Sequence, residues 1–208
     1  MQKLLSREQI NNIQIEENGE RLVLVKGTDR LKISDKFADV FLVREKVLEM
    51  LNEAADSLPI GFTLIFLEGF RSRQKQQQIW DSAILKVEKG NPNFSKEEIG
   101  RKVRLSVAAP TGKGGHQTGG AVDVALGDEK GNELFLGTEA WGFSEKTFTF
   151  NELISSEEQE LRKVLFDAMI KAGFQNYPAE WWHYSYGDQL WAAYGGHPKA
   201  IYSHLDIE

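Results

Sequence analysis

Residues 62–70 read FTLIFLEGF, a run rich in Phe, Leu and Ile that predicts a buried β-strand. A second strand is predicted at residues 121–126, AVDVAL, directly after a glycine-rich loop at residues 107–120. A turn at residues 128–131, DEKG, sends the chain back into ELFLG and predicts a hairpin. These stretches form the centre of the expected sheet.

The flanking stretches predict helices. Apolar residues recur at helical spacing over residues 40–58, and Pro59-Ile60-Gly61 ends that pattern. A second helix is expected over about residues 73–89, and Ser95 with Glu98 forms a capping box for a short helix to about residue 105. Ser156 with Gln159 is expected to open the last long helix, which Gly173 ends.

Two further segments are expected to be extended. Residues 20–33 predict a hairpin with its turn at Gly27-Thr28-Asp29, and residues 174–195 are aromatic and strand-like. Together the elements predict an α+β protein with a small, mainly antiparallel sheet flanked by helices. The length predicts a single domain over residues 1–208.

Composition excludes several classes of function. The net charge of −6 disfavours nucleic-acid binding, and no apolar run is long enough to span a membrane. The absence of cysteine excludes disulfides, thiolate catalysis and cysteine-bound zinc, so imidazole and carboxylate groups must hold any metal. The first residues lack a secretory signal, so we expect a cytoplasmic location; a periplasmic one stays open if further residues precede this sequence. The oligomeric state is not indicated.

Two short stretches concentrate side chains with chemical potential. In GHQTGGAVD, residues 115–123, a glycine turn allows His116 and Asp123 to converge. The plain alternative is a glycine-rich turn followed by a strand with one hydrogen-bonded aspartate. In PAEWWHYSYGD, residues 178–188, Glu180 and His183 stand among aromatic residues. Taken alone, that stretch favours a buried aromatic cluster.

The two stretches together predict a metal site. Two imidazoles and one carboxylate with an open fourth position are the layout of a catalytic zinc site. Glu180 lies beside the last of these groups, where a general base for the metal-bound water would stand. The HExxH signature of the common zinc proteases is absent.

The motifs GGHQTGGAVD and EWWH resemble the SxHxxGxAxD and ExWH motifs of the D-alanyl-D-alanine dipeptidase family, and the likeness covers roughly residues 35–195. The resemblance implies one zinc ion per chain, held by His116, Asp123 and His183, and a small dipeptide substrate. It implies that Glu180 takes the proton of the attacking water. It also implies that Arg71 shares with zinc the negative charge of the tetrahedral intermediate.

The chain departs from the family pattern at two positions. Gly114 replaces the family serine, and Trp141 stands where the family has an aspartate that helps to hold the substrate ammonium. Glu139 supplies a carboxylate from a neighbouring position, and both departures are expected to concern the substrate and not zinc. Three alternatives stay open. One is a D,D-carboxypeptidase acting on peptidoglycan stem peptides, and another is a non-heme iron oxygenase, since two histidines and one carboxylate also fit its facial triad. The third is a metal-binding module without turnover, which the departures at Gly114 and Trp141 keep open.

Overall fold

A five-stranded sheet with the strand order β3-β5-β6-β8-β7 lies at the centre of the protein. The computed structural model describes residues 4–34, 41–104, 107, 109–110, 114–142 and 144–206. The strands are β3 (Leu31–Ile33), β5 (Phe62–Glu68), β6 (Ala121–Asp128), β7 (Gln175–Asn176) and β8 (His183–Ser185). Within this five-stranded sheet, β3 and β5 pair in parallel and the other pairs are antiparallel. The expected α+β class with a mainly antiparallel sheet is confirmed, although the sheet is mixed.

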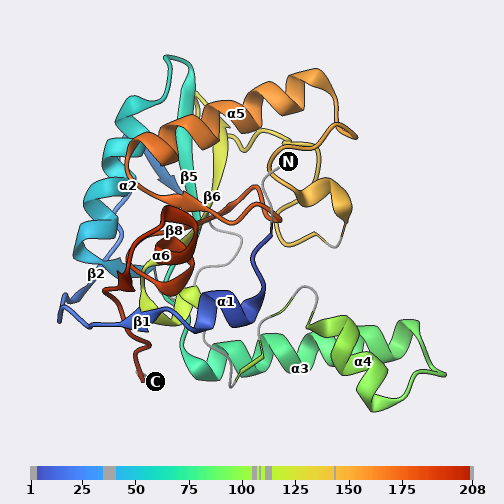
Figure 1. Cartoon of the computed structure of the whole chain (residues 1–208). Helices are drawn as coiled ribbons and strands as arrows, with labels where there is room; N and C mark the ends of the chain where they lie inside the picture. The colour runs from blue at the N-terminus through green and yellow to red at the C-terminus, as the bar shows by residue number, and fades with distance from the viewer. Residues whose placement is uncertain are drawn as a thin grey trace.

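Some helices lie against this sheet, and others stand apart from it (Figure 1). The helices are α1 (Arg7–Asn11), α2 (Glu45–Ser57), α3 (Arg73–Gly90), α4 (Lys96–Val103), α5 (Ser156–Lys171) and α6 (Gln189–Gly195), with 3-10 turns η1 (Gly115–Thr118) and η2 (Glu145–Thr147). Two small sheets complete the fold: β1 (Gln14–Ile15) pairs with β9 (Lys199–Ala200), and β2 (Leu22–Leu24) pairs with β4 (Leu42–Arg44). Among the described residues, no helix combines the length and the apolar character needed to cross a membrane.

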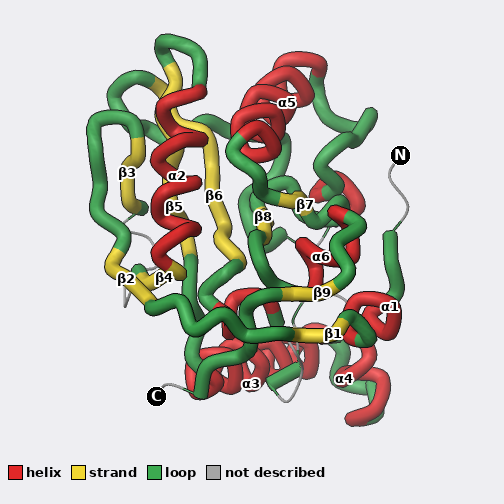
Figure 2. The backbone as a smooth tube through the Cα atoms, turned by 60° about the vertical axis from the view of Figure 1, so that its left-hand side comes forward, coloured by secondary structure: helices red, strands yellow, loops and turns green. Residues whose placement is uncertain are grey.

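The helices divide between the sheet and a projecting arm. Helices α2 and α5 contact each other and the strands, and both lie over the sheet in two views (Figures 1 and 2). Helices α3 and α4 pack mainly against each other and project from the body (Figure 1). Strands β5 and β6 carry the core because nearly every residue in them is buried. A strand buried on both faces provides a rigid base for a site.

The two central strands and the turn after β6 form as predicted. Glu133 pairs with Gly127 across that turn, and Leu134 donates to Leu126. Helices α3 and α4 also match their predictions, and the capping box of Ser95 and Glu98 is present. The predicted glycine-rich loop is described at residues 107, 109–110 and 114–120, and η1 lies within it.

The predicted hairpin at residues 20–33 is wrong. Strands β2 and β3 both exist, but β2 pairs with β4 while β3 pairs with β5. The turn itself is present, since Thr28 exchanges hydrogen bonds with Leu31. Pairing of β3 with the seven-residue strand β5 places Leu31 fully buried in the core. Burial of this side chain favours the β3–β5 pair over a hairpin of β2 with β3.

Three helix predictions need correction. Residues 42–44 are extended, so the helix predicted over 40–58 begins at Glu45; residue 40 lies outside the described residues. The capping box of α5 uses Ser155 and Glu158, one residue before the predicted pair. The aromatic segment contains α6, because the side chain of Asp188 caps that helix at Trp191. These differences concern helix ends and one short element, which local patterns locate poorly.

Arg44 ties both ends of the chain to the glycine-rich turn. Its side chain is 2% exposed and donates from Nε to the carbonyl of Thr118 at 2.8 Å. Nη1 and Nη2 each lie 3.1 Å from a carboxylate oxygen of Glu17, and Nη1 also donates to the Glu20 carbonyl. The guanidinium carbon lies 4.8 Å from the ring centre of Tyr202. One buried cation therefore joins segments that are distant in sequence.

We expect Arg44→Ala to lower the free energy of unfolding by roughly 3 kcal/mol, because it removes the cation paired with Glu17 and takes the Arg44 donor from the carbonyls of Thr118 and Glu20. Urea denaturation followed by circular dichroism measures this change. Arg21→Ala is the matched control, since Arg21 pairs with Glu45 at the surface with its side chain 73% exposed. Equal losses in the two variants would contradict the role assigned to Arg44.

Glu17, the ion-pair partner of Arg44, should make the stability of the fold depend on pH in the acid range. Burial acts to raise the pKa of Glu17, but hydrogen bonds from Ser203 and Gly19 and the charge of Arg44 lower it overall. Because the folded-state pKa is the lower one, Glu17 stabilises the fold above its ordinary pKa. This contribution is lost as the pH falls through the lowered value. Glu17→Gln should flatten the acid limb of Tm against pH, whereas the surface variant Glu49→Gln should not.

Candidate metal centre

Asp123 and His183 face each other across neighbouring strands. They are direct partners in the β6–β8 ladder, just as Val122 pairs with Tyr184. The charges of Arg162 and Asp167, two residues of α5, act on the pKa of Tyr184. The face of the sheet that carries Val122 and Tyr184 is therefore the face that α5 covers. Side chains alternate along a strand, and Asp123 and His183 therefore project from the opposite face. The sheet register alone brings these two groups together.

His116 reaches the same place from the η1 turn before β6. Gly119 ends that turn with φ 74°, a left-handed conformation that suits glycine. A Cβ atom on Gly115 would collide with the carboxylate of Asp188, and one on Gly120 would collide with the carbonyl of Tyr186. The glycines flanking His116 are thus required by close packing as well as by the turn.

The three side chains form a compact, buried cluster. Asp123 Oδ1 lies 2.9 Å from His183 Nδ1 and 3.3 Å from His116 Nε2. One ligand atom from each residue lies within 4.8 Å of the others. His116 Nδ1 lies 2.8 Å from the carbonyl of Gly69, and a carbonyl only accepts, so Nδ1 carries the proton. The other ring nitrogen of His116, Nε2, faces Asp123 and is the atom through which this imidazole can bind a metal when it carries no proton.

The electrostatics of the cluster suit a divalent cation. Burial acts to raise the pKa of Asp123, but the charges and hydrogen bonds of His116 and His183 outweigh it and lower the pKa. Burial likewise acts to lower the pKa of His183, while the hydrogen bond and charge of Asp123 raise it. The carboxylate thus stays ionised in a buried place, where it needs a positive neighbour. Two imidazoles and a carboxylate are also donors that zinc accepts.

Glu180 lies in the turn that leads into β8. Its backbone N–H donates to Tyr177 and its carbonyl accepts from His183, so the backbone is fixed beside the cluster. Among the described residues its carboxylate has no hydrogen-bond partner. Burial, followed by the charge of Asp123, raises its pKa, although His183 and other positive charges act in the opposite direction. A carboxylate with these properties is suited to accept a proton.

Arg71 follows β5 and is not the surface side chain that its sequence context alone would suggest. The side chain is 12% exposed, and its backbone N–H donates to the carbonyl of His116 at 3.1 Å. Nε and Nη2 donate to Glu68, and Nη1 donates to Gln76 at 2.8 Å. Desolvation acts to lower the pKa of Arg71, but Glu68 raises it overall, so the guanidinium stays charged.

Several groups around the cluster were not predicted from sequence. Trp141 Nε1 donates to Asp123 Oδ2 at 2.7 Å, a contact with a candidate metal ligand that the sequence did not indicate. The hydroxyl of Ser185 donates to Asp188 at 2.9 Å and lies 3.5 Å from His183 Nε2.

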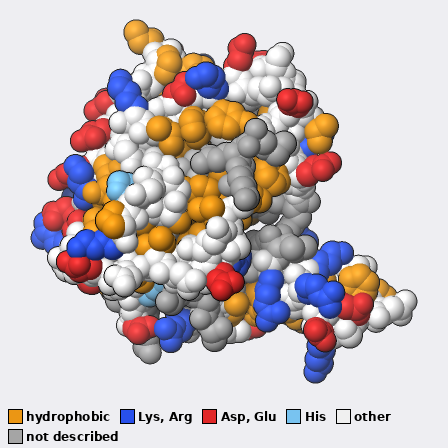
Figure 3. Space-filling model, viewed as in Figure 1, with side chains coloured by type: hydrophobic (Ala, Val, Ile, Leu, Met, Phe, Trp, Pro, Cys, Tyr) orange, Lys and Arg blue, Asp and Glu red, His pale blue; other side chains and the backbone are white. Residues whose placement is uncertain are grey.

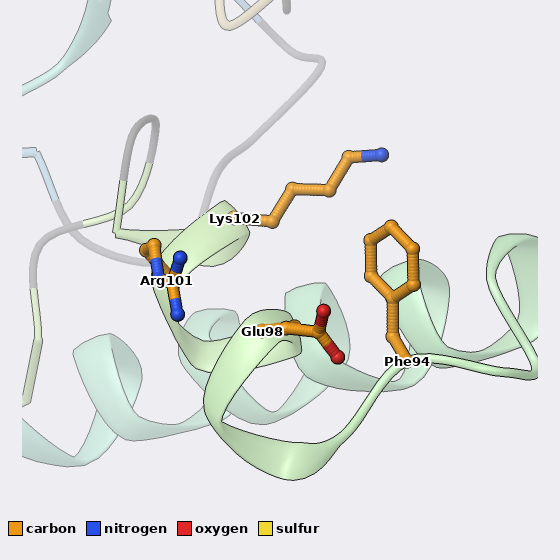
Figure 4. A pocket seen from close by; sticks show the side chains of 4 residues that line it. All are labelled: Phe94, Glu98, Arg101 and Lys102. Atoms are coloured by element: carbon orange, nitrogen blue, oxygen red, sulfur yellow. The ribbon is translucent and has the colours of Figure 1, made fainter.

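Two surface features lie outside the cluster: a hydrophobic area on one face of the body, and a small pocket on the arm formed by α3 and α4. Figure 3 shows hydrophobic side chains gathered near the middle of one face and charged side chains around its rim. A small pocket on α4 is lined by Phe94, Glu98, Arg101 and Lys102, as Figure 4 shows. These side chains have local roles. Glu98 accepts a hydrogen bond from the backbone N–H of Ser95, the N-cap residue of α4, and the Lys102 ammonium lies over the Phe94 ring. The His116–Asp123–His183 cluster is therefore the candidate site.

A mixed sheet with two imidazoles and a carboxylate clustered beside it, and with Glu180 and Arg71 nearby, has the groups that a metal-dependent hydrolase uses. The family model described as D-ala-D-ala dipeptidase (Peptidase_M15) matches residues 23–204, and the chain belongs to this family. The match confirms the resemblance seen in the sequence and the expected class, a zinc metallopeptidase.

Individual relatives are more distant. A D-alanyl-D-alanine dipeptidase of Synechocystis sp. is 28% identical over 73% of this chain and 72% of its own length. A D-alanyl-D-alanine dipeptidase of Escherichia coli is 25% identical over 60% of this chain and 55% of its own length. A solved structure of VanYB in complex with D-alanine-D-alanine has 19% identity and a TM-score of 0.49, over 93% of this chain and 92% of that one.

Proposed function

We propose that this protein hydrolyses D-alanyl-D-alanine, or a related D-amino-acid dipeptide, with one zinc ion held by His116, Asp123 and His183. The observation that carries the proposal is the buried cluster of these three side chains in a chain of the D-ala-D-ala dipeptidase family. The relatives named as D-alanyl-D-alanine dipeptidases support this substrate class. The family match over residues 23–204 supports a single domain spanning residues 1–208.

The reaction divides between the metal and two charged side chains. Zinc, when bound, supplies Lewis-acid chemistry and brings the pKa of water close to neutrality. Glu180 accepts the proton of the attacking water and delivers it to the leaving amine. A raised pKa makes the Glu180 carboxylate a better proton acceptor than an ordinary glutamate, which suits a group that takes up a proton and then passes it on.

Arg71 stabilises the negative charge that develops on the scissile carbonyl oxygen. A guanidinium has five N–H bonds, and Glu68 and Gln76 use three of them, on Nε, Nη1 and Nη2. One N–H on each terminal nitrogen is left to face the substrate. Because the ion pair holds the planar group in place, little reorganisation is needed when the charge appears.

We expect Arg71→Ala to lower kcat/KM by about 10²–10³-fold, the usual cost of removing one charge-stabilising donor. Arg73→Ala is the control, since Arg73 is 69% exposed and pairs with Asp206. Steady-state kinetics with D-alanyl-D-alanine measure both variants. A loss of the same size in Arg73→Ala would contradict the specific role of Arg71.

A panel of substrates tests the proposed function. D,D-, L,L- and L,D-dipeptides and an acylated D-alanyl-D-alanine are incubated with the protein, with and without a chelator. The proposal expects cleavage of the free D,D-dipeptide that stops with the chelator and returns with zinc. Preference for the acylated substrate would instead identify a D,D-carboxypeptidase, and no cleavage at all would identify a binding module. Metal analysis of the purified protein separates zinc from iron.

The cytoplasmic location expected from the sequence is also a proposal. A free dipeptide is a substrate that a cytoplasmic enzyme can meet, whereas a stem peptide of the cell wall lies outside the cytosol. Fractionation of cells that express the protein, followed by immunoblotting, tests the location directly.

A further inference from the structure

The two carboxylate oxygens of Asp123 have different partners. Oδ1 faces both imidazoles, at 2.9 Å from His183 Nδ1 and 3.3 Å from His116 Nε2. Oδ2 accepts a hydrogen bond of 2.7 Å from the indole N–H of Trp141. A carboxylate with one oxygen engaged in this way presents the other oxygen alone to its remaining neighbours. The indole thus distinguishes two oxygens that are chemically equivalent in an isolated aspartate.

Trp141 adopts a backbone conformation that is uncommon for its type. Its φ is 58°, and no other described residue except glycine has a positive φ. The left-handed region is unfavourable for a bulky side chain, by about 1 kcal/mol or more. Such a conformation persists only where surrounding structure enforces it, and here it places the indole N–H on Asp123.

Helix α5 anchors the segment that carries Trp141. Arg162, a buried residue of α5, donates to the carbonyls of Leu136, Lys146 and Phe148, which bracket the segment on both sides. These three bonds anchor the segment on both sides of Trp141, at Leu136 before it and at Lys146 and Phe148 after it.

We propose that Trp141 is a positioning residue that orients Asp123, so that Oδ1 alone is offered to the metal together with the two imidazoles. The inference rests on the proposed metal site. Groups that hydrogen-bond to metal ligands set the orientation of those ligands, and their loss commonly weakens metal binding by about 10–100-fold. Without such a partner, the aspartate side chain would have to be ordered when the metal binds, and that loss of entropy would weaken metal binding.

The test compares two indole-to-phenyl substitutions. Trp141→Phe removes the N–H that reaches Asp123 and keeps an aromatic ring, and Trp181→Phe removes an N–H that reaches only Thr138. Zinc affinity is measured by competition with a chromophoric chelator. We expect Trp141→Phe to weaken zinc binding by about 10–100-fold and Trp181→Phe to leave it within about 3-fold of the unmodified protein.

A second variant and a second measurement keep the test decisive even if Trp141→Phe fails to fold. Trp141→Gly accepts a φ of 58° without strain and also lacks the indole, so it should lose zinc affinity to a similar extent. The visible absorption spectrum of the cobalt-substituted protein reports the donor set directly. It should change in both Trp141 variants and stay unchanged in Trp181→Phe, with thermal unfolding of the metal-free proteins confirming that each is folded.

The outcomes separate this inference from the proposed function. Unchanged zinc affinity and cobalt spectra in folded Trp141→Phe and Trp141→Gly would overturn the positioning role and leave the metal site standing. Equal weakening in Trp181→Phe would overturn it too, since the effect would then come from general loosening of the segment. Failure of the unmodified protein to bind zinc would instead overturn the proposed function.

Discussion

Glu180→Gln should lower kcat for D-alanyl-D-alanine by about 10²–10⁴-fold, the usual contribution of a general acid–base residue. Glutamine has nearly the shape of glutamate but cannot take the proton of the attacking water. The carboxylate is not one of the three clustered ligand groups, so zinc should stay bound at about one ion per chain. Single-turnover kinetics and zinc analysis of the same preparation measure both quantities.

The pH dependence strengthens this test. Burial and the nearby Asp123 raise the pKa of Glu180, and a base acts only when ionised. Activity of the unmodified protein should therefore fall as the pH drops through a value above that of an ordinary glutamate. The residual activity of Glu180→Gln should lack this limb, and the exposed control Glu152→Gln should keep it. Full activity in Glu180→Gln would contradict its role as the base.

His183→Ala should abolish both zinc binding and hydrolysis. The change removes one of three buried ligand groups and leaves Asp123 facing a cavity, so the remaining two groups cannot hold the ion at comparable affinity. Zinc that binds only the folded state stabilises it by about 2.7 kcal/mol at 100 times its Kd. The unmodified protein should therefore show a higher Tm when zinc is added, and His183→Ala should show no such rise.

His197→Ala is the matched control for that experiment. His197 stacks on Trp191 with ring centres 3.8 Å apart and takes no part in the cluster. Its loss should leave the zinc content and the zinc-dependent rise in Tm unchanged. A zinc content in His183→Ala equal to that of the control would show that the metal binds elsewhere in the chain.

Much of the candidate site could be predicted from sequence because its groups lie in two short stretches with strong local signals. His116 and Asp123 flank a glycine turn, and Glu180 and His183 stand three residues apart among aromatic residues. In the structure, His116, Asp123 and His183 cluster as predicted, with one possible ligand atom of each within 4.8 Å of the others. Arg71 carried no local signal, and only the family resemblance singled it out; the structure buries it beside His116.

The groups that support the site escaped prediction because their partners are distant in sequence. Trp141 donates to a residue 18 positions earlier, and His116 bonds to Gly69, 47 positions away. No periodicity or motif encodes such a pair. The pairing of β2 with β4 was missed for a related reason, since burial of Leu31 against β5 outweighed the local preference for a hairpin.

The sequence by itself determined the α+β class, the two buried central strands, most helices and the residue types available to bind a metal. These features follow from periodicity, turn residues and composition, which act over a few neighbouring residues. Only the tertiary structure decided the strand order, the burial of Arg71 and the contact of Trp141 with Asp123. Those depend on which distant surfaces exclude water together, and packing of the whole chain sets that outcome.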